Sequence, residues 1–317
     1  MSGIPLIHSL IFYMAKYLIL CITIILAVPV TACDVCGSGP GNYYNGLLPH
    51  FRKHFIGLRF QQSRLQAHLG PDGRATYLSS RERSSVMEVW GGTQLGSRFR
   101  VMFSLPYTMI RRDAGGIAEK QSGPGDINLV GYYDLLSPKE GQSFRQTLWI
   151  GGGVKLPTGR YNEDQENIGL GMQNNFQLGS GSVDFSTNLV YDAAYKNTGI
   201  NASLACRFNT ANRYGYRYGN RFTANLLIYQ QVRISDRFSI RPNGGLLLES
   251  SAKDEKVKGI TVWNSGGHSE SLVGGLEISS GKINIGANVQ SPVAQHIAEK
   301  RVRLDSRFMA YVSFSFP

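Results

Sequence analysis

The sequence contains little charge and few cysteines. Only 17% of its residues are Asp, Glu, Lys or Arg, and cysteine occurs four times in 317 residues. No segment after residue 33 keeps a helical period over a long window, which argues against a helical body. Cys21 lies in the first apolar run, and the three cysteines beyond it are an odd number, so they do not describe a disulfide scaffold.

Glycine and aromatic residues are plentiful instead. The chain has 37 Gly, 16 Tyr and 15 Phe. A charge-poor chain of this composition suits strands that face lipid and carry aromatic girdles at the membrane interfaces. At this length, one large barrel fits the composition better than two soluble domains.

The first 32 residues have the pattern of a secretory signal. Lys16 precedes an apolar run over residues 17–32, which ends on the small-residue sequence Val30-Thr31-Ala32. The run is about 16 residues long and contains Pro29, whereas a membrane-spanning helix needs about 20 residues. We therefore expect a cleaved signal peptide over 1–32 rather than a signal anchor. Because Cys33 follows directly, cleavage with lipidation of Cys33 stays open as an alternative.

The rest of the chain alternates with a period of two, in runs of about ten residues. In the last run, Phe308, Val312 and Phe314 share one face, opposite Met309 and Tyr311. The same test predicts twelve strands, over residues 54–67, 84–95, 98–110, 126–136, 145–157, 182–195, 199–210, 221–234, 237–250, 269–279, 282–292 and 306–316. Their connections alternate between short and long, as turns and loops do in outer-membrane barrels.

These patterns predict an all-β fold, a closed antiparallel transmembrane β-barrel of about 12 strands over residues 54–317, with short periplasmic turns and longer external loops. An even number of strands places both ends on the periplasmic side. In lipid every backbone N–H and C=O must be paired within the protein, and a closed sheet leaves no free edge. A soluble β-sandwich would also alternate, but it would need neither a signal peptide nor outward Phe and Leu on nearly every strand.

Four short motifs occur in the order found in one family of outer-membrane barrels. They are Gly125-Asp126-Ile127, Lys155-Leu156-Pro157-Thr158-Gly159, Gly179-Ser180-Gly181-Ser182 and Val289-Gln290-Ser291-Pro292-Val293. On these motifs the chain resembles the barrels grouped with the MetA pathway of phenol degradation. The sequences Cys33-Asp34-Val35-Cys36-Gly37 and Gly46-Leu47-Leu48-Pro49 resemble a subgroup with an N-terminal cysteine motif. The resemblance implies a barrel in the outer membrane of Gram-negative bacteria, and transport of a solute that it does not name.

Charged residues on the inward faces are the candidates for lining the lumen. They are Arg59, Glu88, Arg100, Asp126, Lys155, Asp184, Arg207, Arg241, Glu249 and Arg307. With Arg233, Asp134, Asp192 and Glu277, seven basic residues face seven acidic ones, which favours a lattice of ion pairs. Twelve strands lie between filled eight-stranded barrels and open sixteen-stranded porins. We therefore expect a narrow polar lumen for small solutes.

The excess positive charge is expected in external loops, at residues such as Arg111, Arg112 and Lys120. Phosphates of outer-membrane lipids, lipopolysaccharide included, would be attracted there. One loop interleaves arginine and tyrosine, with Arg213, Tyr214, Tyr216, Arg217 and Tyr218 as candidate ligand contacts. Tyrosine at the membrane interface is the simplest interpretation, and capture of an aromatic or glycan ligand is the alternative. An exported barrel is not expected to meet nucleic acid.

Residues 33–53 are predicted to form a periplasmic segment before the barrel. Cys33, Cys36, His50 and His54 have nearly the spacing of a two-Cys, two-His zinc site. The glycine-rich stretch between them has no helix pattern, so a nucleic-acid finger does not follow. A periplasmic zinc or copper site competes with lipidation of Cys33, which would remove that thiolate. No cofactor is expected.

The function predicted from the sequence is an outer-membrane channel or transporter that gives small molecules, hydrophobic or aromatic ones included, a passive path. No Ser, His and Asp arrangement typical of a hydrolase is recognisable, so an enzyme is not expected; His268 would be the residue to test. The alternative is a non-conducting barrel that binds a ligand, metal or partner through the Cys/His segment or the Arg/Tyr loop. Phe316 is the aromatic residue that the barrel-assembly machinery would recognise.

Overall fold

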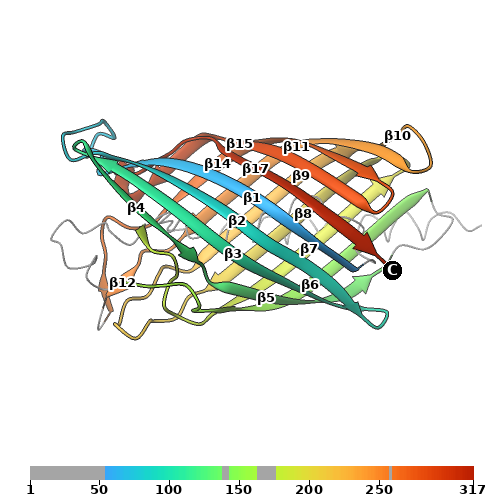
Figure 1. Ribbon diagram of the computed structural model, residues 1–317, viewed down its shortest axis with the longest axis horizontal. Coiled ribbons are helices and arrows are strands. Elements are labelled where there is room, and N and C mark those ends of the chain that lie inside the picture. Colours follow the sequence, from blue (N-terminus) through green and yellow to red (C-terminus); the bar gives the residue numbers. More distant parts are fainter. Residues whose placement is uncertain (1–53, 138–142, 163–175, 257–258) are drawn as a thin grey trace, which may run out of the picture. The chain divides into compact units, whose positions relative to one another are not determined.

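The computed structural model describes residues 54–137, 143–162, 176–256 and 259–317, and strands dominate these ranges (Figure 1). The strands are β1 (His54–Ala67), β2 (Ser80–Leu95), β3 (Phe99–Ala114), β4 (Ile117–Pro124), β5 (Ile127–Leu136), β6 (Phe144–Leu156), β7 (Asp184–Tyr195), β8 (Thr198–Phe208), β9 (Arg221–Gln230), β10 (Val232–Arg233), β11 (Phe238–Ser251), β12 (Glu255–Lys256), β13 (Ile260–Thr261), β14 (Gly267–Ser280), β15 (Ile283–Ile297), β16 (Arg303–Leu304) and β17 (Arg307–Phe316). A short 3-10 helix covers Ala298–Lys300. Within the described ranges, no helix has the length and hydropathy to cross a bilayer.

The long strands form one closed antiparallel sheet. Their order is β11-β14-β15-β17-β1-β2-β3-β5-β6-β7-β8-β9, and β9 pairs in turn with β11 (Figure 1). The first and last barrel strands meet from His54 opposite Phe316 to Gln62 opposite Phe308. The prediction of a closed twelve-stranded barrel is therefore confirmed. The signal peptide and N-terminal segment predicted over residues 1–53 lie outside the described residues.

The connections keep the predicted alternation between short and long. Turns at 96–98, 196–197 and 281–282 lie at one end of the barrel, together with the C-terminus (Figure 1). Longer segments at 68–79, 157–183, 209–220 and 252–266 join the strands at the other end. In an outer-membrane barrel the short turns are periplasmic and the long loops are external.

One predicted loop is a hairpin instead. The predicted strands 98–110 and 126–136 leave residues 111–125 as a long external loop, but β3 continues to Ala114 and β4 returns beside it from Ile117. Gly115 and Gly116 form the turn, with φ of +55° and +84°, a backbone conformation that glycine adopts without strain. A Gly-Gly pair between two extended runs is a hairpin signal, so this correction was available in the sequence.

The outward face of the barrel is apolar. Every barrel strand carries at least two exposed large hydrophobic side chains; Leu58, Phe185 and Ile228 are more than half exposed. Soluble monomers rarely expose contiguous apolar surface on this scale. Hydrocarbon is the solvent that fits such a surface, while the closed sheet satisfies the backbone.

Candidate functional site: the barrel interior

Charged side chains predicted to face inward meet as ion pairs across neighbouring strands. Arg59 on β1 pairs with Glu88 on β2, and Ser104 of β3 donates a hydrogen bond to the same carboxylate. Arg241 Nη1 on β11 lies 3.5 Å from Glu277 Oε2 on β14. Because a buried charge without a partner is costly, such pairing is the arrangement expected of a narrow interior.

One ion pair crosses the interior. Arg307 on β17 and Glu249 on β11 are separated in the sheet by β14 and β15, yet Arg307 Nη1 lies 3.1 Å from Glu249 Oε1. Their side chains are 3% and 7% exposed. The pair therefore bridges part of the interior at this level, from one strand to another three places along the sheet.

Arg100 and Arg207 lie on inward faces as predicted, whereas two other arginines, Arg112 and Arg233, lie where the sequence did not place them. Arg100 is buried on β3, and Arg207 is half-buried on β8. Arg112, expected in an external loop, instead lies on the inward face of the extended β3, and its Nε donates to Glu82 Oε1 at 2.9 Å. Arg233, expected inside, is exposed in the short β10, because the alternation of β9 ends at Gln230.

The middle of the interior combines apolar and polar side chains. One cluster of buried side chains contains Phe55, Trp90, Met102, Val130, Tyr132, Trp149, Val190, Leu227, Tyr229, Leu247, Val273, Met309 and Tyr311, and we call it the inner belt. Trp90 meets Phe55 and Tyr311 edge-on, with ring centroids 4.6 and 5.7 Å apart. The guanidinium of Arg59 lies 5.0 Å from the centre of the Trp90 ring, so ion pairs flank the belt. Buried Asn201, Asn288 and Gln290 lie opposite members of the belt, so the polar interior that the sequence predicts also contains an apolar cluster, which a count of inward charges does not reveal.

Glycines on neighbouring strands make room for three rings of the inner belt. The facing pairs are Tyr132 with Gly151, Tyr229 with Gly199, and Tyr311 with Gly286. A Cβ added to these glycines would lie 2.7, 2.3 and 2.3 Å, respectively, from the facing ring. Each ring therefore lies against the wall of the barrel instead of projecting across the interior.

Three of the family motifs meet at one carboxylate near the external end. Asp126 Oδ1 accepts a hydrogen bond from Gly159 N at 3.0 Å, and Oδ2 accepts from Ser180 N at 2.9 Å and Ser180 Oγ at 3.0 Å. Lys155 Nζ lies 3.0 Å from Asp126 Oδ2 and also pairs with Asp184. We call these five residues the loop anchor. The sequence located its charged members on inward faces but gave no sign that they converge.

The loop anchor holds an external segment against the inner wall. Phe176 and Leu178 are buried and form a cluster with Ile110 on the inward face of β3. The Arg112 guanidinium lies 4.7 Å from the centre of the Phe176 ring. Residues 176–183 therefore narrow the external mouth, and their position depends on the loop anchor that they help to form.

The Arg/Tyr loop is partly buried. Tyr216 and Tyr218 are 1% and 7% exposed, and their rings pack edge-on 5.0 Å apart. The Tyr216 hydroxyl donates to Asp254, which also accepts from Gly219 N at 2.8 Å. Burial raises the pKa of Asp254 to about 6. These two tyrosines pack within the loop, and a role for them in binding a ligand stays a prediction.

The other three candidates in this loop lie nearer the surface. The Arg213 guanidinium lies 4.7 Å from the centre of the Tyr214 ring. Tyr161 stacks on the same Tyr214 ring, with the two centroids 5.7 Å apart. Arg217 pairs with Glu255 at 2.5 Å. Their contacts are with one another and with neighbouring loops, and a role in binding a ligand stays a prediction.

The metal-site prediction falls mostly outside the described residues. Cys33, Cys36 and His50 are not described, whereas His54 starts β1, with Nδ1 2.8 Å from Thr93 Oγ1. Among the residues that are described, no three His, Cys, Asp or Glu side chains gather as metal ligands would. The Cys/His site therefore stays a prediction.

A closed barrel with an apolar exterior, paired charges inside and short turns at one end defines an outer-membrane β-barrel. The chain belongs to the family described as "Putative MetA-pathway of phenol degradation", whose model matches residues 61–293. The family resemblance is thereby confirmed. The N-terminal cysteine motif precedes the matched region and stays a prediction.

Solved structures share the fold. An outer membrane channel from Pseudomonas putida F1 aligns with a TM-score of 0.60 at 15% identity, over 87% of this chain and 99% of that one. The β-domain of the Bordetella autotransporter BrkA gives 0.43 at 13% identity, over 83% and 100%. The transport unit of the autotransporter AIDA-I from Escherichia coli gives 0.45 at 8% identity, over 86% and 92%. At these identities the likeness concerns the fold alone. No curated protein matches the sequence.

Proposed function

We propose that the protein gives small hydrophobic or aromatic molecules a passive path across the outer membrane, without covalent chemistry. The observation that carries the proposal is the inner belt, in which Trp90, Trp149 and Tyr132 are buried inside the barrel. An apolar solute gains contact with these side chains as it loses water, whereas a strongly hydrated ion gains nothing from them. The family and the solved outer membrane channel support this reading.

The order of groups along the interior fits such a path. Arg307 and Glu249 lie near the external ends of β17 and β11, and Met309 and Leu247 of the inner belt follow two residues further in. A solute would first pass a level of paired charges, whose opposite signs leave little net field. It would then meet the inner belt. The width of the interior at the paired charges would limit the size of the solute, and the inner belt would favour aromatic solutes over strongly hydrated ones.

Reconstitution in planar bilayers tests the proposal. We expect small single-channel ion currents that monoaromatic acids and phenols interrupt, more often as their concentration rises. Trp149→Ala should shorten these interruptions, and Trp149→Phe should keep them, because the aromatic surface remains. Trp263→Ala is the matched control, since Trp263 is 74% exposed in an external loop. A barrel that is tight to ions and indifferent to every aromatic solute would refute the proposal and favour a non-conducting barrel.

We also propose the processing and partners of the chain. Export would use the signal over residues 1–32, and the barrel-assembly machinery would insert a barrel surrounded by outer-membrane lipids and lipopolysaccharide. Phe316, in the last strand, is 40% exposed on the outward face, which supports recognition of this end. Mass spectrometry of the mature N-terminus tests the cleavage site. It also shows whether Cys33 is lipidated or remains available, with Cys36 and His50, as a metal ligand.

A further inference from the structure

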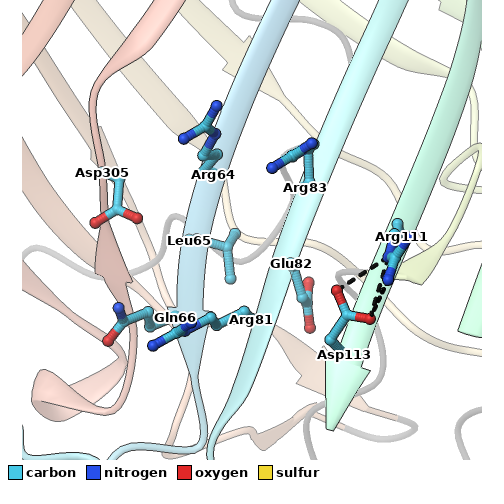
Figure 2. A pocket seen from close by; sticks show the side chains of 9 residues that line it. All are labelled: Arg64, Leu65, Gln66, Arg81, Glu82, Arg83, Arg111, Asp113 and Asp305. Atoms are coloured by element: carbon cyan, nitrogen blue, oxygen red, sulfur yellow. Dashed lines mark hydrogen bonds and ion pairs between the residues drawn. The ribbon is translucent and has the colours of Figure 1, made fainter. Parts of the chain in front are cut away.

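Four basic side chains form a row across the outer surface of the barrel. Arg64 of β1 lies directly opposite Arg83 of β2, which lies opposite Arg111 of β3, which lies opposite Lys120 of β4. All four are exposed, and Arg64 and Arg83 alternate with the buried Leu65 and Glu82, so the row faces outward. We call it the basic row. Figure 2 shows its three arginines on neighbouring strands.

The basic row is electrostatically unfavourable in the protein alone. Like charges directly opposite one another on neighbouring strands destabilise a sheet, because their Cβ atoms are only about 4.5–5.5 Å apart. The carboxylate of Asp113 offsets part of this positive charge, because Arg111 Nη2 donates a hydrogen bond to Asp113 Oδ1 at 2.9 Å. The other acidic residues that line the pocket are Asp305 and Glu82, and Glu82 is buried and already pairs with Arg112. Two further cations, Arg81 and Arg303, are exposed nearby, so the excess of positive charge remains.

The basic row lies where lipid headgroups meet the barrel. Along the same strands, towards the periplasmic end, the outward side chains become apolar: Met109 is two residues from Arg111, and Met87 is four residues from Arg83. At about 3.4 Å per residue, the first lipid-facing side chain is about 7 Å away. The long loops mark this end as external. The facing lipid leaflet is therefore the outer one.

The position and charge of the row are specific to one side of the barrel. The corresponding outward positions near the external ends of β8, β9 and β11 hold Phe208, Phe222 and Leu248. Between the arginines is a pocket of about 510 Å³, which is larger than one phosphate needs (Figure 2). Four strands spaced by about 4.8 Å make the row about 14 Å long, a length that suits two phosphates on one sugar headgroup.

We propose that the basic row binds the phosphates of the outer-leaflet glycolipid, the diphosphorylated disaccharide of lipopolysaccharide. Arginine suits this ligand because its planar guanidinium makes paired hydrogen bonds to phosphate oxygens. The bound phosphates would replace the repulsion along the row with attraction, while the acyl chains would pack on the apolar surface below. The proposal uses the outer-membrane placement from the proposed function, but it does not depend on conduction through the lumen.

The test compares purified full-length protein with the variant R64Q/R83Q/R111Q. A matched control, R98Q/R237Q/K282Q, removes the same charge from exposed residues in the short turns at the other end. The probe is diphosphorylated lipid A in detergent micelles, with dephosphorylated lipid A and inorganic phosphate as separate arms. We expect the wild type and the control to bind diphosphorylated lipid A about tenfold or more tightly than the row variant. This difference should shrink as salt rises.

Three results would overturn the proposal. One is equal affinity of the wild type and the row variant for diphosphorylated lipid A. Another is equal affinity of the wild type for the dephosphorylated lipid, which would mean that only the apolar surface binds. The third is saturation by inorganic phosphate at similar concentration, which would mark a site for the free anion. Heat-modifiable migration on gels checks that each variant keeps its barrel. Single-channel current should be the same in all three proteins, so a failure of the proposed transport would be seen separately.

Discussion

Removal of the Asp126 carboxylate tests whether the loop anchor controls the external mouth. The substitution Asp126→Ala deletes the acceptor of three hydrogen bonds, from Gly159 N, Ser180 N and Ser180 Oγ. It also removes one of the two carboxylates that pair with Lys155, which keeps Asp184. Breaking a buried charged network costs about 3–5 kcal/mol, and the lower half of this range applies because Lys155 stays paired.

A loss of about 3 kcal/mol is decisive for a docked segment. Each 1.4 kcal/mol is a factor of ten, so the ratio of docked to released segment falls about a hundredfold. Since docking places Phe176 and Leu178 inside the wall, release of residues 176–183 should widen the mouth. We expect a larger single-channel current and faster proteolytic cleavage within this segment, while the barrel remains folded.

The controls separate release of the segment from a general effect of charge. Asp113→Ala removes an exposed carboxylate from the outward face of β3 and should leave both readouts unchanged. Phe176→Ala should enlarge the current with little effect on proteolysis, because the anchor itself is intact. If Asp126→Ala keeps wild-type current and wild-type cleavage in a folded barrel, the anchor does not position this segment and the reasoning fails.

Other predictions concern the external loop, the crossing ion pair and the inner belt. Burial raises the pKa of Asp254 to about 6, above its unfolded value of about 3.9, so the folded loop loses stability as pH rises through this window. Hydrogen-exchange protection of the loop, corrected for the intrinsic exchange rate at each pH, should therefore fall from about pH 4 to about pH 6, and Asp254→Asn should abolish this fall. Arg307→Met alone should cost about 3–5 kcal/mol in unfolding free energy, whereas R307M with E249M should restore most of it, as measured by the temperature of heat modification. Gly286→Ala should lower the single-channel current, because its Cβ would displace the tyrosine ring that lies 2.3 Å from it.

The barrel could be predicted from the sequence because lipid enforces a strict rule. Outward apolar side chains that recur every second residue predict a strand at 54–67, which is the observed range of β1. The predicted bounds of the other barrel strands lie within a few residues of the observed ones. The largest discrepancy was the hairpin of β3 and β4, where the strands extend beyond the membrane. There the outward residues, such as Arg111 and Lys120, are polar, so hydropathy no longer distinguishes a strand from a loop.

For the candidate site, the sequence predicted which side chains face the interior but not which of them contact one another. Alternation placed Arg307 and Glu249 inside, but their contact depends on how a twelve-stranded sheet closes and narrows. The loop anchor likewise depends on a segment that returns to the wall 54 residues after Asp126 in the sequence. Sequence separation hides such contacts, and one sequence without aligned relatives gives no second source of information about them.

Glycines set how three tyrosine rings of the inner belt lie. Tyr132, Tyr229 and Tyr311 each face a glycine on the neighbouring strand, where a Cβ would collide with the ring. Each ring therefore packs along the wall of the barrel, in the space that the glycine leaves. Charged pairs such as Arg307 with Glu249 then bridge part of the adjacent level without leaving a strong net field. A passage that is partly bridged, nearly neutral and aromatic in its middle selects for small solutes with an apolar surface.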